Sequence, residues 1–304
     1  MTRDWESVFG GWAAAPSKTE QERSENAITA IRKAIALSDK LKSRGIRVFV
    51  QGSYRNRVNV RRESDVDVGV MLHDYFLTEY PAGKTSADFG NVDVDYTFAR
   101  FKNELEEALV AHFGRAAVRR GNKAFDIKEN SYHVEADVIP LFEFRQYWES
   151  GRCRCGVALI PDKGGRIENY PERLLESWPR TPQHYENGVT KNQATSKAFK
   201  GVVRILKSLR NEMDGADIAA AKPIPGFLVE CLAWNTPNSC FSHTTWREDV
   251  EAVLYHLWSN IKTAENWTEV NDIKYLFYAS QPWTRDQAYT FVNNAWDYVG
   301  LPRS

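Results

Sequence analysis

A strictly alternating segment, residues 65–72 (DVDVGVML), most constrains the fold of this chain. Side chains alternate between the two faces of a β-strand, so the three valines would share one face. Asp65 and Asp67 would share the other face, roughly 6–7 Å apart along the strand. Two carboxylates side by side repel each other and are costly to bury without a partner. The segment therefore predicts a half-buried strand that presents two acids to a ligand.

Two further features suggest which ligand. Gly52-Ser53 precedes the strand by eleven residues, where glycine permits close backbone approach and Ser53 offers a hydroxyl and an N–H to a phosphate. Asp137, in the strand-like segment 132–144, is the best candidate for a third carboxylate. Because hard cations bind carboxylate oxygens, the combination predicts a two-metal site for in-line phosphoryl transfer. An isolated D-x-D would more often be a pair of surface acids.

Charge and composition narrow the class of protein. Lys plus Arg number 40 and Asp plus Glu number 40, so the formal net charge is zero. A protein that coats nucleic acid is normally basic, and a disordered one combines low hydrophobicity with high net charge, so both classes are disfavoured. No apolar run approaches the ~18 residues of a membrane span, and the N-terminus lacks the apolar core of a signal peptide. Four scattered cysteines predict reduced thiols in a cytoplasmic protein.

The periodicity of the chain predicts an α+β fold. The N-terminal half combines strands with helices, expected at 18–44 and 98–113, and short strands at 115–119 and 123–128. Residues 150–190, rich in Gly, Pro, Arg and Asn, indicate a long connection. The rest is expected to be helical at 190–213, 224–235, 246–263 and 284–298. We therefore expect two domains, one over 1–145 and the other over 146–304.

Five stretches of the sequence resemble a known family. The spacing of Gly52-Ser53 and the D-V-D-V strand is similar to the signature of the polymerase-β-like nucleotidyltransferase superfamily. More narrowly, the chain resembles the CdnE-type branch of the bacterial CD-NTases, the cGAS/DncV-like nucleotidyltransferases that make cyclic oligonucleotides. The stretches are QGSYRNRVNVRRESDVDV (51–68), AVRRGNKAF (117–125), NYP (169–171), HYENGVTKNQAT (184–195) and FLVECLAWN (227–235). The resemblance spans roughly 20–300. It implies a nucleotidyltransferase core with an N-terminal spine helix, then a lid and a helical domain like that of oligoadenylate synthase.

The resemblance also implies roles for individual residues. Asp65, Asp67 and Asp137 match the family's catalytic, metal-binding triad, which implies two Mg²⁺ ions, with Mn²⁺ as a substitute. Gly52 and Ser53 match the motif that contacts the donor triphosphate.

Two more nucleotide contacts are expected beyond the connection. Relatives use a lysine of the long helix to contact phosphates, and Lys200 is our first choice, with Lys197 and Lys207 as alternates. Gly226-Phe227 stands where the family has a Ser-Tyr pair. Phe227 can still stack on a base, whereas the phosphate contact of the serine hydroxyl is missing.

Asn169 bears on the choice of base. In CdnE-type enzymes that prefer pyrimidines an Asn precedes a Tyr-Pro in the lid, and Asn169-Tyr170-Pro171 fits this pattern. An amide both donates and accepts, so it can pair with the O4/N3 edge of uracil. A turn role before the proline is the alternative. The resemblance implies UTP as a substrate, with ATP as a second one, and a product such as cyclic di-UMP or cyclic UMP-AMP.

The implied biology is a second messenger in antiphage (CBASS) defence, made by a monomer that needs neither a membrane nor nucleic acid and acts on an effector through its product. Three alternatives stay open. One is a synthase of purine-containing cyclic di- or trinucleotides, and another is a nucleotidyltransferase acting on RNA or a small molecule, although neutral charge disfavours RNA. The third is a nucleotide sensor with a dead site, which the intact triad disfavours.

Other charged or polar residues have two interpretations each. One run of arginines could attract nucleotide phosphates or form a solvated face (Arg47, Arg55, Arg57, Arg61 and Arg62). The same alternatives hold for Arg119, Arg120 and Lys123. A polar group near the lid could contact nucleotide or cap helices (His184, Tyr185, Asn187 and Asn192).

Overall fold

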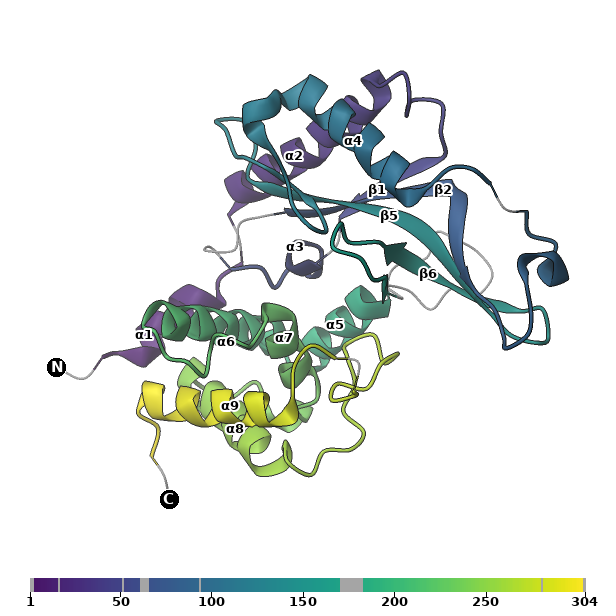
Figure 1. Cartoon of the computed structure of the whole chain (residues 1–304). Coiled ribbons are helices and arrows are strands. Elements are labelled where there is room, and N and C mark those ends of the chain that lie inside the picture. The colour runs from purple at the N-terminus through teal and green to yellow at the C-terminus, as the bar shows by residue number, and fades with distance from the viewer. Residues whose placement is uncertain are drawn as a thin grey trace. The chain divides into compact units, whose positions relative to one another are not determined.

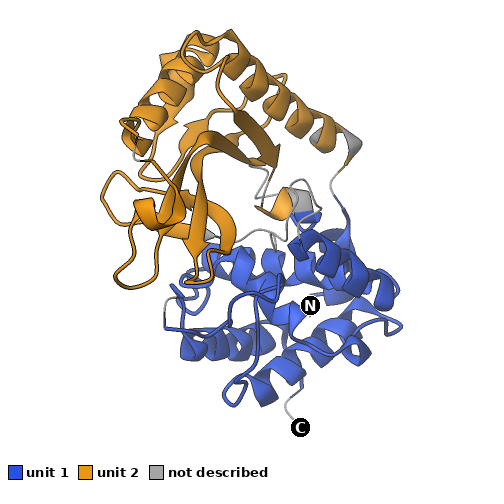
Figure 2. Ribbon diagram, turned by 90° about the vertical axis from the view of Figure 1, so that its right-hand side faces the viewer, with its two compact units in different colours: residues 1–16, 55–63, 181–304 blue, residues 17–54, 64–180 orange. Residues whose placement is uncertain are grey.

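The computed structural model describes residues 3–15, 17–50, 52–60, 66–92, 94–169, 183–279 and 281–302. The chain forms two compact units, coloured separately in Figure 2, each with a hydrophobic core of its own. Unit 1 consists of residues 1–16, 55–63 and 181–304, and unit 2 of residues 17–54 and 64–180. The boundary expected at 145/146 falls inside a strand, β5 (Ala136–Tyr147).

Unit 2 is built around a mixed sheet. Its strands follow the order β1 (Ile46–Val50), β2 (Val66–Glu79), β5, β4 (Phe125–Ile127) and β3 (Val118–Arg120). β2 and β5 run parallel, whereas the other neighbours in this order are antiparallel. In addition to its pairing with β4, β5 pairs with β6 (Cys153–Leu159) along its C-terminal part. β6 in turn pairs with β7 (Ile167–Asn169). This mixed sheet with helices confirms the expected α+β class.

Two helices cover one face of this sheet, α2 (Lys18–Leu37) and α4 (Phe98–Phe113), as Figure 1 shows. The valines of the alternating segment are completely buried, in one core with Ile31 of α2 and Phe101 of α4. Burying one such side chain contributes about 1.5–3 kcal/mol, and a slip of one residue would move all three valines out of this core to the face that carries Asp67. The apolar alternation therefore determines which face of β2 carries Asp67.

The elements of unit 2 differ from expectation in two places. The helix expected to reach residue 44 ends at Leu37, and a turn follows in which Lys42 N–H bonds to Ser38 O at 2.8 Å. Leu41 is still buried, because the turn keeps the apolar position that the helical pattern predicted. The expectation of a long connection over 150–190 is wrong for 153–169, where β6 and β7 extend the sheet. The segments between β5 and β6 and between β6 and β7, which contain glycines, are the turns of two antiparallel hairpins.

Short helices complete the two units: α3 (Gly52–Asn56), which joins one unit to the other, and η1 (Ser86–Phe89) and η2 (Arg115–Ala117) in unit 2. Unit 1 also contains η3 (Asn238–Cys240). None of the helices in the described part of the chain is long and apolar enough to cross a membrane.

Unit 1 is helical. Its helices are α1 (Trp5–Ala13), α5 (Gln183–Ala194), α6 (Ala198–Gly215), α7 (Gly226–Trp234), α8 (Trp246–Asn260) and α9 (Arg285–Val299). Helix α1 was not expected from the sequence; Asp4 caps it, and its buried residues recur every four positions. Arg204 of α6 explains why distant segments join this unit: its Nε donates to Ala13 O and its Nη1 to Arg57 O, each at 2.8 Å.

Candidate active site

Carboxylates from neighbouring strands line up on one face of the sheet in unit 2. Asp67 of β2 lies directly opposite Asp137 of β5, and Asp137 lies directly opposite Asp126 of β4. Residues paired in this way project to the same face, with side chains about 5 Å apart. All three are half-buried. The register thus brings together two of the expected triad and adds Asp126, which the sequence analysis did not single out.

The backbone at Gly52 lies against Asp67. A Cβ placed on Gly52 would come within 2.0 Å of Asp67 Oδ2, and its φ of +69° is in the left-handed region. Any other residue would therefore displace the carboxylate and be strained as well. Ser53 follows as the second residue of α3 and is half-buried. This arrangement holds the Gly-Ser turn beside one end of the carboxylate row.

Asp65 and the side chain of Asn169, both expected in the site, lie outside the described part of the chain. Asn169 ends β7, where its backbone pairs with Val157 of β6, but its side chain is not among those described. The Tyr170-Pro171 that follows it is also outside the described residues.

The donor set at this edge suits a hard divalent cation. Asp67 and Asp137 offer carboxylate oxygens, the ligands that Mg²⁺ prefers, and the missing side chain of Gly52 lets the carboxylate of Asp67 lie against the turn. Within the described residues, which omit Asp65, no three His, Cys, Asp or Glu side chains are grouped to hold a metal. The pair thus fits such an ion, and a third acid must complete the site.

The three candidate lysines lie in unit 1 in different surroundings. Lys200 of α6 is buried, with its Nζ 5.2 Å from the centre of the Tyr185 ring. Its burial lowers the pKa of its ammonium, as do Arg57 and Arg204, while Glu230 acts in the opposite direction. Lys207 is buried against the same glutamate, and Lys197 is exposed. Lys207 is thus committed to an internal ion pair.

Phe227, the second residue of α7, presents part of its ring to solvent. Phe227 is 37% exposed, and its ring packs against His184 and Trp283, with ring centroids 5.9 and 6.0 Å away. His184 Nε2 in turn lies 2.8 Å from Oε1 of the buried Glu230. Although burial raises the pKa of Glu230, His184 and Lys207 bring it below its ordinary value. The ionised Glu230 therefore holds the imidazole ring of His184, against which Phe227 packs.

The arginine-rich run does not stay within one unit. Arg47 belongs to β1 of unit 2, whereas Arg57 belongs to unit 1, where its carbonyl accepts from Arg204. Arg61, Arg62 and the side chain of Arg55 are outside the described residues.

Two asparagines of the expected polar group make hydrogen bonds within unit 1. Asn187 Nδ2 donates to Val270 O at 2.6 Å, and Asn192 Oδ1 accepts from the Lys200 amide at 3.0 Å. Both side chains therefore support the fold.

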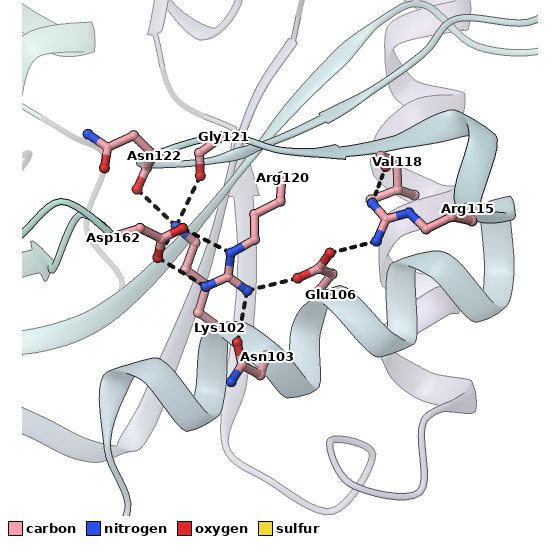
Figure 3. Close-up of polar contacts among 9 residues, drawn as sticks. All are labelled: Lys102, Asn103, Glu106, Arg115, Val118, Arg120, Gly121, Asn122 and Asp162. Carbon is pink, nitrogen blue, oxygen red and sulfur yellow. Dashed lines mark hydrogen bonds and ion pairs between the residues drawn. The ribbon is translucent and has the colours of Figure 1, made fainter.

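Ionic contacts anchor the turn between β3 and β4, as Figure 3 shows. Lys102, almost fully buried, donates to Gly121 O at 3.2 Å and Asn122 O at 2.9 Å, and contacts Asp162 at 3.0 Å. Arg120 bonds to the same Asp162 through Nε and Nη2, which lowers the pKa of that acid to about 2. Arg120 is therefore structural. Arg119 instead pairs with Asp126 at the carboxylate row, and Lys123 lies in the turn itself.

Similarity to known proteins identifies the family of this chain. The profile described as "cGAS/DncV-like nucleotidyltransferase C-terminal helical domain" matches residues 186–300. The cyclic dipyrimidine nucleotide synthase CdnE of Legionella pneumophila is 40% identical over 98% of this chain and 99% of its own length. The chain belongs to the CdnE-type cGAS/DncV-like nucleotidyltransferases. It is therefore an enzyme of the nucleotidyltransferase class, as the resemblance implied.

Two further relatives agree with this assignment. The cyclic dipyrimidine nucleotide synthase CdnE of Cecembia lonarensis is 35% identical over 98% of this chain and 99% of its own length. The structure of the Rhodothermus marinus CdnE c-UMP-AMP synthase with Apcpp and Upnpp matches with a TM-score of 0.79 and 28% identity over 98% of both chains. Enzymes of this class generally depend on a divalent metal, which agrees with the acids on β2 and β5.

Proposed function

We propose that this CD-NTase joins two nucleoside triphosphates into a cyclic dinucleotide that contains at least one pyrimidine. The observation that carries the proposal is the in-register pair Asp67 and Asp137 beside the turn at Gly52. The names of the relatives support the pyrimidine, since two of them are dipyrimidine synthases and the third is a c-UMP-AMP synthase.

The proposed reaction consists of two phosphoryl transfers. A ribose hydroxyl of one nucleotide attacks the α-phosphorus of the other, a P–O bond forms, and the bond to the departing pyrophosphate breaks. The hydroxyl loses its proton in this step. The linear intermediate, which keeps one triphosphate, then turns around and repeats the step within itself. Each of the two transfers releases one pyrophosphate, so the ring closes without a further reactant.

Unit 2 would carry out this chemistry as the nucleotidyltransferase core. Asp65, Asp67 and Asp137 would hold two Mg²⁺ ions, with Mn²⁺ as a substitute, which supply positive charge to the triphosphate and the leaving pyrophosphate. Gly52 brings backbone close to the donor phosphates, and Ser53 donates a hydrogen bond to them. The lining of the site thus compensates the charge that develops during transfer.

The helical unit and the lid would complete nucleotide binding. Lys200 contacts the triphosphate, and Phe227 stacks on a base. Asn169 pairs with the O4/N3 edge of uracil through its amide, which both donates and accepts. UTP is the proposed first substrate and ATP the second.

We further propose a cellular role by family. The product would act as a second messenger that activates an effector in antiphage defence, and the enzyme would work as a cytoplasmic monomer. The balanced charge supports action without nucleic acid, because RNA binding requires the neutralisation of many phosphates.

Incubation of the purified protein with all four NTPs and Mg²⁺ or Mn²⁺ tests the proposal. Phosphatase-resistant products are identified by mass spectrometry, and Asp67→Asn and Asp137→Asn serve as inactive controls. We expect a cyclic dinucleotide containing uridine, and its loss in both variants. Full activity of Asp67→Asn would remove the site assignment.

The same assay separates the alternatives. Cyclic products that contain only purines would support a purine-using synthase. Products that appear only after an RNA or a small-molecule acceptor is added would indicate the other transferase. Nucleotide binding without pyrophosphate release would indicate a sensor.

A further inference from the structure

The carboxylate row in unit 2 ends in an arginine. Arg119 of β3 lies directly opposite Asp126 of β4, which lies opposite Asp137 of β5. Because paired residues project to the same face, Arg119, Asp126, Asp137 and Asp67 form one row across four strands. With strands about 4.8 Å apart, Arg119 stands two strands, or about 10 Å, beyond Asp137.

Asp126 holds Arg119 in place without covering it. Nε of Arg119 lies 2.5 Å from Asp126 Oδ2, and Nη2 contacts the same oxygen. The side chain of Arg119 is 78% exposed, whereas that of Asp126 is only 22% exposed. A guanidinium has five N–H donors, so one carboxylate oxygen cannot satisfy it. Most of the cation therefore remains able to bind a second anion.

The next residue, Arg120, shows the opposite behaviour. Its Nη1 donates to Asn103 and Glu106, each at 2.8 Å, and its other nitrogens bond to Asp162 (Figure 3). Together with Lys102, these contacts fasten the β3–β4 hairpin to α4. Because the hairpin is fastened, the backbone at Arg119 has a defined position, and this lowers the entropic cost of binding a ligand there.

The two ends of the row are distinct. Gly52 and its turn lie against Asp67, so the proposed donor triphosphate belongs at that end. In an in-line displacement the attacking hydroxyl approaches from the side opposite the leaving pyrophosphate. The second nucleotide must therefore enter from beyond Asp137, where Arg119 stands.

We propose that Arg119 binds the triphosphate of the acceptor nucleotide and that Asp126 is its positioning residue. This inference rests on the proposed function. In the first transfer the acceptor carries a triphosphate, but in ring closure that triphosphate belongs to the donor end and the acceptor end carries only a phosphodiester. Arg119 should therefore act in the first transfer far more than in closure.

A pair of analogues isolates the first transfer. 2′,3′-Dideoxy-UTP can only donate, and α,β-methylene-UTP can only accept, so together they form one linear product. We expect Arg119→Ala to raise the KM for the acceptor by about tenfold or more, as for a lost charge-assisted contact, and to change the KM for the donor by less than about twofold. Arg119→Lys should recover part of the loss because it keeps the charge. Asp126→Asn should raise the same KM by a smaller factor.

Two further measurements exclude a merely structural role. With uridine as acceptor, which has no phosphate, the wild type and Arg119→Ala should react equally. Ring closure of a synthetic linear pppUpU should proceed in Arg119→Ala at about the wild-type rate. Arg152→Ala, at an exposed arginine in the turn between β5 and β6, serves as the matched control and should leave every step unchanged.

Several outcomes would overturn this inference. An unchanged acceptor KM in Arg119→Ala, an equal loss with uridine, or an equal loss in ring closure would each contradict it. A wild-type protein that forms no cyclic product from NTPs would instead contradict the proposed function. Equal melting temperatures of Arg119→Ala and the wild type establish that the comparison is made between folded proteins.

Discussion

At the scale of single residues, glycine at position 52 is required by its surroundings. It combines a positive φ with an approach to Asp67 that leaves no room for a Cβ. Gly83, between β2 and η1, has a similar φ of +77°, but a Cβ at that position would have no neighbour within 4 Å. The two glycines therefore separate the effect of backbone strain from the effect of displacing a carboxylate.

Gly52→Ala is expected to lower product formation at least about 100-fold, because a shift of about 1 Å at a catalytic group has an effect of that size. The strain itself should cost only about 1–3 kcal/mol, so the protein stays folded. Product formation is measured by mass spectrometry and folding by thermal melting. Gly83→Ala, which bears the same strain, should keep full activity, and an equal loss in both variants would refute the role of Asp67.

Asn169→Ser tests the proposed base selection. A serine hydroxyl cannot pair with the uracil edge as an amide does, so the fraction of uridine in the product should fall relative to purines. The ratio is measured with equimolar NTPs. Asn91→Ser, at a side chain that donates to the Tyr80 hydroxyl, serves as a control remote in sequence. An unaltered base profile in Asn169→Ser would mean that this residue has a structural role.

At the scale of elements, contacts with turns hold the helices and hairpins in place. The β3–β4 hairpin is tied to α4 through Lys102, and α5 is tied to the segment after α7 through Lys191. Nζ of Lys191 donates to Thr236 O at 2.6 Å and to Asn238 Oδ1 at 3.0 Å. Both lysines are buried and make hydrogen bonds, as buried polar groups in proteins normally do.

Lys191 should make stability depend on pH. Burial lowers the pKa of its ammonium to about 8, below its ordinary value of 10.5, although Cys240 acts weakly against this. Between these two pH values the unfolded chain binds more protons at Lys191 than the folded chain does. The contribution of Lys191 to the free energy of unfolding therefore rises with pH. Between about pH 8 and pH 10.5, the free energy of unfolding of the wild type should rise by on the order of 1–3 kcal/mol relative to that of Lys191→Met. Denaturant unfolding at several pH values measures it.

A flat difference between the two proteins would mean that the charged form survives in the folded state. Three aromatic rings would then be the cause, because they surround Nζ at 5.3–5.7 Å: Phe199, Trp234 and Phe241. Lys222→Met, at a lysine whose side chain is 57% exposed, provides the control and should show no such gain.

At the scale of the whole molecule, the two compact units do not follow the order of the chain. Helix α1 belongs to the core formed by helices more than 180 residues later, and Phe9 is fully buried there. Glu6 of the same helix accepts hydrogen bonds from the first two amides of α8. The N-terminus is thus a structural part of the C-terminal helical unit.

Phe9→Ala should therefore lower the free energy of unfolding by about 3–5 kcal/mol, the usual cost of removing a buried phenylalanine. Limited proteolysis should show earlier cleavage within 183–302 than within unit 2. Gly11→Ala in the same helix, where nothing lies within 4 Å of the added methyl group, should be neutral or stabilising. Equal stability of Phe9→Ala and the wild type would contradict the placement of α1 in this core.

The sequence by itself determined the local features of this protein. The alternation of 65–72 predicted that Val66, Val68 and Val70 are buried and that Asp67 lies on the other face, because side-chain direction follows from the period of a strand. The expectation of a half-buried strand is wrong beyond Asp67, because Gly69 and Met71 on that other face are buried as well. The helix at 98–113 was predicted with its observed bounds from its amphipathic pattern, and the structure adds that Thr97 caps it. Family membership likewise followed from motifs.

Only the tertiary structure decided how distant segments meet. The position of Asp126 beside Asp137, the end of the row at Arg119 and the place of α1 in unit 1 depend on strand register and on packing between segments far apart in the chain. Periodicity gives the face on which a side chain lies but not its partner on the next strand. That partner is selected by the burial of the whole sheet and of the helical core, which no local pattern contains.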